Sequence, residues 1–360
     1  MQTHPWRLEK HRQHHHHGGC LGQIQSGGPI GGCCLPDASD QWNPPFCEES
    51  YGTLEDIPGV CGGHSVGTLW NDSMADPAAA LSLGEACWRN FILGVVQGLT
   101  EFLPISSTAH LKAVPVLLGW GDPGVSVIAA IQLGSIGAVI AYFRSDLSQV
   151  LRGITRALRH GQWREPDARL GIAMAIGTLP ILVLGLVIKG FGHEAYETSP
   201  LRSIPAIAVV SIVMALLLAL AERIGARRKD LKTVSGRDGL LVGAAQALAL
   251  IPGVSRSGST LTASLFDGWT RPDAARFSFL LGIPAITIAG LVELTDAFAA
   301  AGAAGPLPLI TGILSASVVS WLAIDWLLKF LQRHSTWVFV GYRLLFGVVL
   351  LAWWGRYGAH

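Results

Sequence analysis

The chain has 360 residues; half are hydrophobic and only 14% are charged, against about 25% in an ordinary soluble domain. The 26 basic and 25 acidic residues nearly cancel, which excludes a nucleic-acid binder that depends on a strong positive field. Together with 43 Gly and 19 Pro residues, which are common in membrane helices, this composition predicts a polytopic membrane protein.

Residues 1–73 differ in composition from the rest. They contain five of the six cysteines and a histidine run at His14–His17, but no periodic apolar stretch. A Cys/His-rich tract can bind metal, but the spacing lacks the C-x₂-C pair of a zinc site. We therefore expect a disordered or non-native N-terminal extension. Met74 precedes the first apolar run and is our predicted initiator, which makes 74–360 one membrane-embedded domain.

Six apolar runs are long enough, or nearly so, to cross a bilayer core of about 30 Å at 1.5 Å per residue. They cover residues 125–143, 170–190, 204–220, 277–292, 306–328 and 337–354.

The charges between the runs predict their orientation, because basic residues gather in cytoplasmic loops. Segments 144–169 and 221–238 carry six basic residues each. The segments predicted to be cytoplasmic are 144–169, 221–238, 267–276 and 329–336; those predicted to be outside are 191–203 and 293–305.

Two further apolar stretches, 91–119 and 239–266, are each broken in the middle by Pro and a Ser/Thr cluster. Each half is long enough for only half a bilayer. The charge pattern requires 91–119 to start and end outside, and 239–266 to start and end inside. Both are therefore predicted to be re-entrant hairpins, which need to be buried in protein or to line a wet cavity.

Hairpin plus three spans thus occurs twice in opposite orientation, over about 88–220 and 239–355. The interrupted regions around Pro104 and Pro252, called the first and second break below, have weakly similar sequences, GVVQGLTEFLPISS and GAAQALALIPGVSRS. The predicted fold is an all-α polytopic membrane protein with six transmembrane helices and two re-entrant helical hairpins in an inverted-topology repeat, a plan that many transporters share.

The first break carries Gln97 and Glu101, which share a helix face at i and i+4. An ionisable group deep in an apolar run is a functional-site hypothesis by default. The simpler interpretation is an interfacial or capping glutamate.

Beyond Pro104, Ser106, Ser107 and Thr108 open the returning helix. Hydroxyls and free N–H groups at a helix N-terminus can bind an anion, or serve only as caps. His110 lies three residues beyond Ser107 on the same face. It is a candidate proton carrier, or a buried histidine whose hydrogen bonds are satisfied.

The second break reads PGVSRSGST and sets several hydroxyls around Arg256. A guanidinium fork matches phosphate oxygens bidentately. Pairing with Glu101 is the structural alternative, and both are compatible in the empty protein.

A buried carboxylate, hydroxyls, a histidine, an arginine and two helix N-termini indicate phosphoryl transfer on a lipid-borne phosphate. A phosphate or lipid carrier is the rival, since inverted repeats with broken helices suit transport equally well. Ser107 and His110 favour the enzyme, because a carrier needs neither a nucleophile nor a base. A lipid phosphatase with paired histidines is disfavoured, since His110 alone lies in a motif.

The runs QGLTEFLPISSTAH and PGVSRSGST closely resemble the two signature motifs of the undecaprenyl-diphosphatase family, also called the bacitracin-resistance protein family. The runs IQLGS and FSFLLGIP are similar to that family too, and the resemblance covers roughly 85–355. It implies a hydrolase of the bacterial inner membrane that converts undecaprenyl diphosphate to undecaprenyl phosphate and phosphate. This recycles the lipid carrier of peptidoglycan synthesis and gives bacitracin resistance.

The resemblance also implies roles for single residues. Glu101 would be the essential acidic residue, acting in catalysis and binding a divalent cation, Mg²⁺ or Ca²⁺. Ser107 would be the nucleophile with His110 as acid/base, and Arg256 would hold the diphosphate. Gln97 stands where the family often has a second Glu. The predicted substrate contacts are Gln97, Ser106, Thr108, Ser255, Ser257, Gly258 and Thr260; partners are the prenyl lipid and the bilayer, with no nucleic acid and a homodimer left open.

Overall fold

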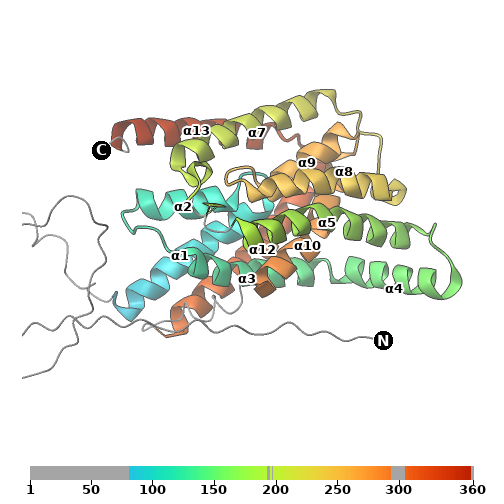
Figure 1. Cartoon of the computed structure of the whole chain (residues 1–360), viewed down its shortest axis with the longest axis horizontal. Helices are drawn as coiled ribbons and strands as arrows, with labels where there is room; N and C mark the ends of the chain where they lie inside the picture. Colours follow the sequence, from blue (N-terminus) through green and yellow to red (C-terminus); the bar gives the residue numbers. More distant parts are fainter. Residues whose placement is uncertain (1–80, 193–194, 197, 293–304, 358–360) are drawn as a thin grey trace, which may run out of the picture. The chain divides into compact units, whose positions relative to one another are not determined.

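The computed structural model describes residues 81–192, 195–196, 198–292 and 305–357. The predicted extension 1–73 and most of the outer segment 293–305 lie outside these described residues. The described chain is helical and contains no β-strand. Its α-helices (Figure 1) are α1 (Leu83–Phe102), α2 (Ser107–Leu117), α3 (Val125–Tyr142), α4 (Arg144–His160), α5 (Pro166–Phe191), α7 (Ile204–Ile224), α8 (Gly236–Ala247), α9 (Arg256–Phe266), α10 (Arg271–Val292), α12 (Leu307–Arg333) and α13 (Trp337–Tyr357).

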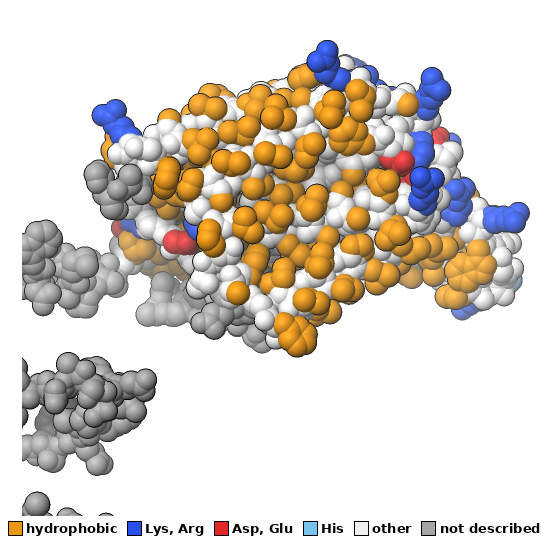
Figure 2. All heavy atoms as spheres, turned by 45° about the horizontal axis from the view of Figure 1, so that its top comes forward, with side chains coloured by type: hydrophobic (Ala, Val, Ile, Leu, Met, Phe, Trp, Pro, Cys, Tyr) orange, Lys and Arg blue, Asp and Glu red, His pale blue; other side chains and the backbone are white. Residues whose placement is uncertain are grey.

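Five of these helices are long and apolar enough to cross a membrane, namely α5, α7, α10, α12 and α13. A sixth span results if α3 and α4, which meet at a bend of 67°, are counted together. Large apolar side chains cover the face shown in Figure 2, while most of the Lys and Arg side chains in that view lie towards its ends. Leu216, Leu345 and Val348 are more than half exposed. The prediction of an all-α polytopic membrane protein is confirmed.

Segment 144–169, predicted as a cytoplasmic loop, instead contains the 17-residue helix α4. Leu147, Val150 and Ile154 recur at helical spacing and face the protein, while arginines occupy the other side. A Cβ on Gly153 would come within 2.5 Å of Asp167 in α5. The loop prediction was wrong because the basic residues conceal an amphipathic helix that packs closely on α5.

Both predicted hairpins are broken where the sequence indicates. α1 ends at Phe102 and α2 begins at Ser107; α8 continues into the 3₁₀ helix η3 (Leu248–Leu250), and α9 begins at Arg256. The N-caps Ser106 and Ser255 both have positive φ, 77° and 70°, a conformation that non-Gly residues rarely adopt. The two breaks therefore share one backbone geometry. That they are re-entrant stays a prediction.

The two predicted repeats cross-pack through glycines. α1 lies against α12, where a Cβ on Gly94 would come within 1.9 Å of the Ser315 hydroxyl. α8 lies along α5 (Figure 1), where a Cβ on Gly243 would come within 2.2 Å of the Gly177 carbonyl oxygen. In each case the first helix of a hairpin packs on the second predicted span of the other repeat. Two inverted copies of one unit would pack in this way.

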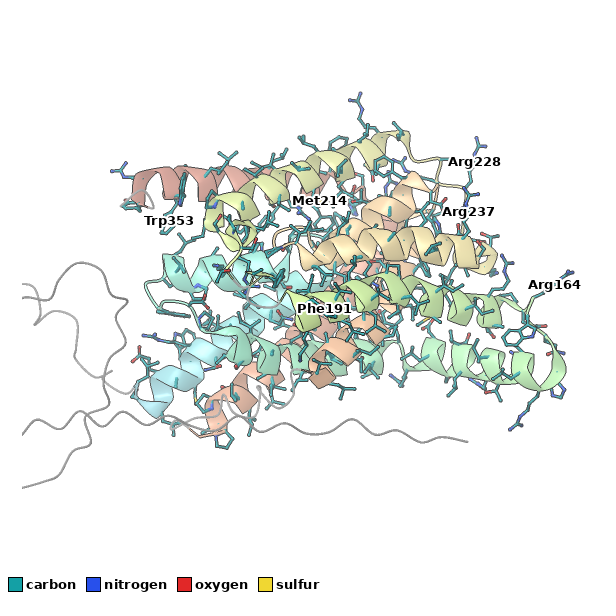
Figure 3. The ribbon with its side chains drawn as sticks, viewed as in Figure 1. Arg164, Phe191, Met214, Arg228, Arg237 and Trp353 are labelled. Atoms are coloured by element: carbon teal, nitrogen blue, oxygen red, sulfur yellow. The ribbon has the colours of Figure 1, made fainter. Side chains whose placement is uncertain are left out.

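Arg164, Arg228 and Arg237 lie at the same end of the helices in Figure 3, as their predicted cytoplasmic location requires. Lys229 at this end pairs with Asp238 at 2.7 Å and with Asp267 at 2.6 Å. Burial raises the pKa of the Asp238 carboxyl, but hydrogen bonds from Lys229 and Ser235 outweigh burial and lower it to about 2. These contacts tie the α7–α8 connection to the start of α8 and the end of α9.

Candidate active site

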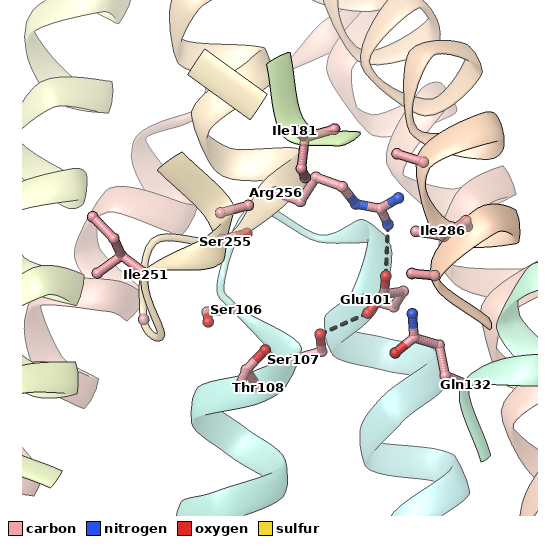
Figure 4. Close-up of a pocket in the computed structure, with 14 residues that line it drawn as sticks. Glu101, Ser106, Ser107, Thr108, Gln132, Ile181, Ile251, Ser255, Arg256 and Ile286 are labelled. Carbon is pink, nitrogen blue, oxygen red and sulfur yellow. Dashed lines mark hydrogen bonds and ion pairs between the residues drawn. The ribbon is translucent and has the colours of Figure 1, made fainter. Parts of the chain in front are cut away.

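One cavity of about 180 Å³ lies where the two breaks meet (Figure 4). The first break supplies Glu101, Ser106, Ser107 and Thr108, and the second supplies Ser255 and Arg256. Gln132 reaches the cavity from α3. The remaining wall is apolar and comes from α5, α10 and the second break: Ile181, Ala249, Ile251, Gly253, Ala285, Ile286 and Ala289. The cavity lining is thus part polar and part apolar.

The Glu101 carboxylate is the centre of the polar side. Its Oε1 accepts a hydrogen bond from Arg256 Nη2 at 2.6 Å. Its Oε2 accepts one from the Ser107 hydroxyl at 2.6 Å and another from Gln97 Nε2 at 3.1 Å. Figure 4 shows the first two as a chain from Arg256 through Glu101 to Ser107. One carboxylate thus links a cation from the second break to a hydroxyl from the first.

Two helices begin at this cavity. Ser106, the N-cap of α2, makes no side-chain capping bond, so the first N–H groups of α2 are not satisfied by their own cap. Ser255, the N-cap of α9, accepts a hydrogen bond from the Gly258 N–H at 3.1 Å. Helix N-termini carry partial positive charge and free donors. Together with Arg256 they make the polar side of the cavity suited to an anion.

Five predicted site residues do not line the cavity. Gln97 is buried and reaches it only through Glu101. Ser257 donates to the Leu103 carbonyl at 2.9 Å, and Thr260 donates to the Arg256 carbonyl at 2.8 Å. The Ser257 bond therefore joins the two breaks, whereas the Thr260 bond lies within α9 and the Gly258 N–H donates to Ser255 in the second break.

His110 is the fifth, and its ring is engaged elsewhere. Nδ1 lies 2.7 Å from the Ser106 carbonyl oxygen, and Nε2 lies 2.6 Å from the Tyr342 hydroxyl. A carbonyl only accepts, so Nδ1 carries the proton, and in the neutral ring Nε2 accepts from Tyr342. The ring also stacks on Phe346 of α13, with centroids 4.2 Å apart.

Three residues near the two breaks, Gln132, Tyr342 and Arg343, had no predicted role. Gln132 faces Glu101 in Figure 4. Gln132 could have been recognised as a candidate because it is a polar amide inside the apolar run 125–143, within the motif IQLGS. Tyr342 gave no comparable signal, whereas Arg343 is a charged residue inside the last span and so a functional candidate by position.

The donors present suit a divalent cation only in part. Among the described residues, no group of three or more His, Cys, Asp and Glu side chains is placed so that it could hold a metal ion. Glu101 is the carboxylate that lines the cavity, accompanied by the Gln132 amide and the hydroxyls of α2. Mg²⁺ is commonly held by one or two carboxylates plus substrate phosphates. This donor set therefore fits a cation that arrives with phosphate oxygens.

Such a site can bind a phosphate, lower the charge on its oxygens and present a hydroxyl that is already bonded to a base. Comparison with known proteins agrees with this chemistry. Residues 90–349 match the model of the family described as bacitracin resistance protein BacA.

The chain is similar to proteins named undecaprenyl-diphosphatase. The one from Parasynechococcus marenigrum (strain WH8102) is 80% identical over 287 residues, which are 80% of this chain and all of that protein. The one from Synechococcus sp. strain CC9605 is 78% identical over 80% of this chain and 100% of its own length. The one from Synechococcus sp. strain WH7803 is 79% identical over 77% of this chain and 96% of its own length. The chain therefore belongs to the bacitracin resistance protein BacA family.

Proposed function

We propose that this chain removes the terminal phosphate of undecaprenyl diphosphate and releases undecaprenyl phosphate and inorganic phosphate. The names of its relatives support the substrate. The observation that carries the proposal is the shared carboxylate: Glu101 accepts from the Ser107 hydroxyl and from Arg256, at 2.6 Å each. The proposed nucleophile, base and phosphate-binding arginine are thus joined by direct hydrogen bonds.

In the proposed reaction, the terminal phosphate lies against Arg256 and the N-termini of α2 and α9. Ser107 Oγ forms a bond to the terminal phosphorus as the anhydride P–O bond breaks, and Glu101 takes the hydroxyl proton. The leaving group is the lipid monophosphate. Glu101 passes its proton to the oxygen of the leaving group and is again a carboxylate. A water then attacks the phosphoserine phosphorus as the bond from Ser107 Oγ to phosphorus breaks. Glu101 takes a proton from this water and returns it to Ser107 Oγ, and phosphate is released. Arg256 and the helix N-termini stabilise the charge on the transferring group.

The base in this proposal is Glu101. The ring nitrogens of His110 are occupied by Ser106 and Tyr342, and its ring does not line the cavity. We assign His110 to shaping the Ser106 backbone, which has a φ of 77°. Ser106 and Thr108 line the cavity with Ser107 and would contact the phosphate oxygens.

A divalent cation, Mg²⁺ or Ca²⁺, is part of the proposal. Glu101 and the substrate phosphates would hold it, with Gln132 and the hydroxyls of α2 nearby. When bound, it would supply positive charge that offsets the negative charge of the diphosphate.

The apolar side of the cavity suits the lipid part of the substrate. Ile181, Ile286 and Ala289 would contact the first isoprene units next to the diphosphate. A multi-pass protein with a prenyl lipid substrate belongs in the membrane that holds this lipid, which we take to be the bacterial inner membrane. The homodimer stays a prediction.

Residues 1–73 are not needed for this activity in our proposal. The 287-residue relative is matched over its whole length, and Met74–His360 has the same number of residues. A chain shortened to Met74–His360 should keep the turnover of the full chain when both are purified and compared. A shortened chain that folds but does not turn over would contradict this.

The test of the function is phosphate release from undecaprenyl diphosphate by the purified full chain with Mg²⁺ or Ca²⁺. Ser107→Ala should lower kcat at least about 100-fold. Ser148→Ala, in α4 and outside the cavity lining, is the matched control and should act like the wild type. Absence of release from a folded wild-type protein that binds the lipid would refute the phosphatase and favour a carrier.

A further inference from the structure

Arg343 in α13 is a buried cation that the proposed reaction does not use. Its side chain is 1% exposed, and it does not line the cavity. Among the described residues no carboxylate forms an ion pair with it. An unpaired buried charge costs several kcal/mol unless hydrogen bonds or dipoles compensate it.

The guanidinium donates to four backbone carbonyls. Nη1 donates to the Pro104 and Val254 carbonyls at 3.1 Å each, and Nη2 donates to the Gly253 carbonyl at 2.7 Å. Nε donates to the Ser211 carbonyl of α7 at 3.3 Å. Pro104 belongs to the first break, and Gly253 and Val254 belong to the second. One side chain therefore joins both breaks to α7 and α13.

The compensation comes from helix polarity. α1 ends two residues before Pro104, and the 3₁₀ helix η3, which continues α8, ends three residues before Gly253. Helix C-termini carry partial negative charge. Two negative ends thus converge on one guanidinium, while the positive ends of α2 and α9 line the cavity. The fit is close, because a Cβ on Gly258 would come within 2.9 Å of Arg343 Nη1.

The bonded carbonyls lie close in sequence to the reacting groups. Pro104 is three residues before Ser107, and Val254 is two residues before Arg256. Ser107 and Arg256 must address one phosphate through the shared Glu101, so their relative position depends on how the two breaks are aligned. A shift of about 1 Å in such an alignment can cost about 100-fold in rate.

We propose that Arg343 is a positioning residue that holds the two breaks in register, so that Ser107 and Arg256 act on the same phosphate. This inference rests on the proposed phosphatase function. Arg343 acts through the backbone of both breaks and does not touch the substrate.

The test compares Arg343→Ala and Arg343→Lys with the wild type and with Arg356→Ala, which removes an exposed arginine from the same helix. Folding is checked by size-exclusion chromatography and thermal unfolding in detergent, and phosphate release gives kcat and KM per folded molecule. Both Arg343 variants should lose about 100-fold in kcat, with KM changed less than threefold. Guanidinium chloride, far below denaturing concentrations, should restore part of the kcat of Arg343→Ala, and NaCl of equal ionic strength should not.

Other results would overturn the proposal. A folded Arg343→Ala with wild-type kcat would show that the register does not depend on the guanidinium. A raised KM with unchanged kcat would place Arg343 in substrate binding. Failure of both variants to fold would assign Arg343 to the fold as a whole. Absence of turnover in the wild type beside them would instead refute the proposed function.

Discussion

Glu101→Gln separates the two tasks that the proposed mechanism gives to one carboxylate. Glutamine has nearly the same shape and can still accept a hydrogen bond, but it carries no charge and is no base. Since Glu101 Oε2 is 2.6 Å from the Ser107 hydroxyl, the variant should lose general-base catalysis, which contributes about 10²–10⁴ in rate.

The same change should affect the empty protein and the bound protein in opposite ways. The Arg256–Glu101 pair is largely buried, with side chains 14% and 8% exposed. Removing one partner of a buried pair costs about 3–5 kcal/mol, because the remaining charge is uncompensated. A diphosphate supplies that missing negative charge. Without divalent cations, Glu101→Gln should therefore be less stable when empty but should bind diphosphate more tightly than the wild type.

The assay combines phosphate release from undecaprenyl diphosphate with calorimetric binding of a non-hydrolysable methylene analogue of diphosphate. Glu165→Gln, which alters an exposed carboxylate between α4 and α5, is the matched control. A kcat within threefold of the wild type would refute Glu101 as the base. Weaker binding of the analogue without divalent cations would refute the idea that Glu101 competes with the phosphate for Arg256.

Three further outcomes test other parts of the structure. Tyr342→Phe removes the donor to His110 Nε2 and should lower kcat a few-fold without shifting the pH dependence of kcat. A shift of that pH dependence would indicate that His110 acts as an acid or base in the reaction. Asp238→Asn should lose on the order of 1 kcal/mol at pH 7, allowing for screening at the partly exposed Lys229. Because the Asp238 pKa is lowered to about 2 from about 3.9 in the unfolded chain, urea unfolding should show this difference narrowing from about pH 4 to pH 2. Chelation by EDTA should abolish turnover and either Mg²⁺ or Ca²⁺ restore it, while an unaffected rate would remove the cation from the proposal.

The breaks in the helices could be predicted from the sequence because local chemistry determines them. Pro104 and Pro252 cannot continue a helix, and the hydroxyls that follow favour a new N-terminus. The meeting of Glu101 with Arg256 agrees with the predicted topology, since hairpins that enter from opposite faces would both end near the middle. Their contact at 2.6 Å is the ion pair that we gave as the structural alternative for Arg256 in the empty protein.

His110 shows where local spacing is insufficient. It lies three residues after Ser107, on the same face of a short helix, which suggested that both side chains reach the substrate. Tyr342 and Phe346 of α13 instead contact the ring. These partners are more than 230 residues away in the sequence, so only the packed structure could reveal them. The helical spacing was correct, but tertiary packing determined which way the imidazole faces.

The predicted inverted repeat would explain why the site needs both copies. In each copy one helix ends and the next begins at the break, so each break has a negative and a positive end. Packing the copies against each other brings like ends together, which is unfavourable unless something of opposite charge lies between them. Arg343 lies between the negative ends. The positive ends line the cavity, where a diphosphate would have the required charge. The protein itself balances the negative helix ends with Arg343. The positive helix ends would be balanced only when the substrate is bound.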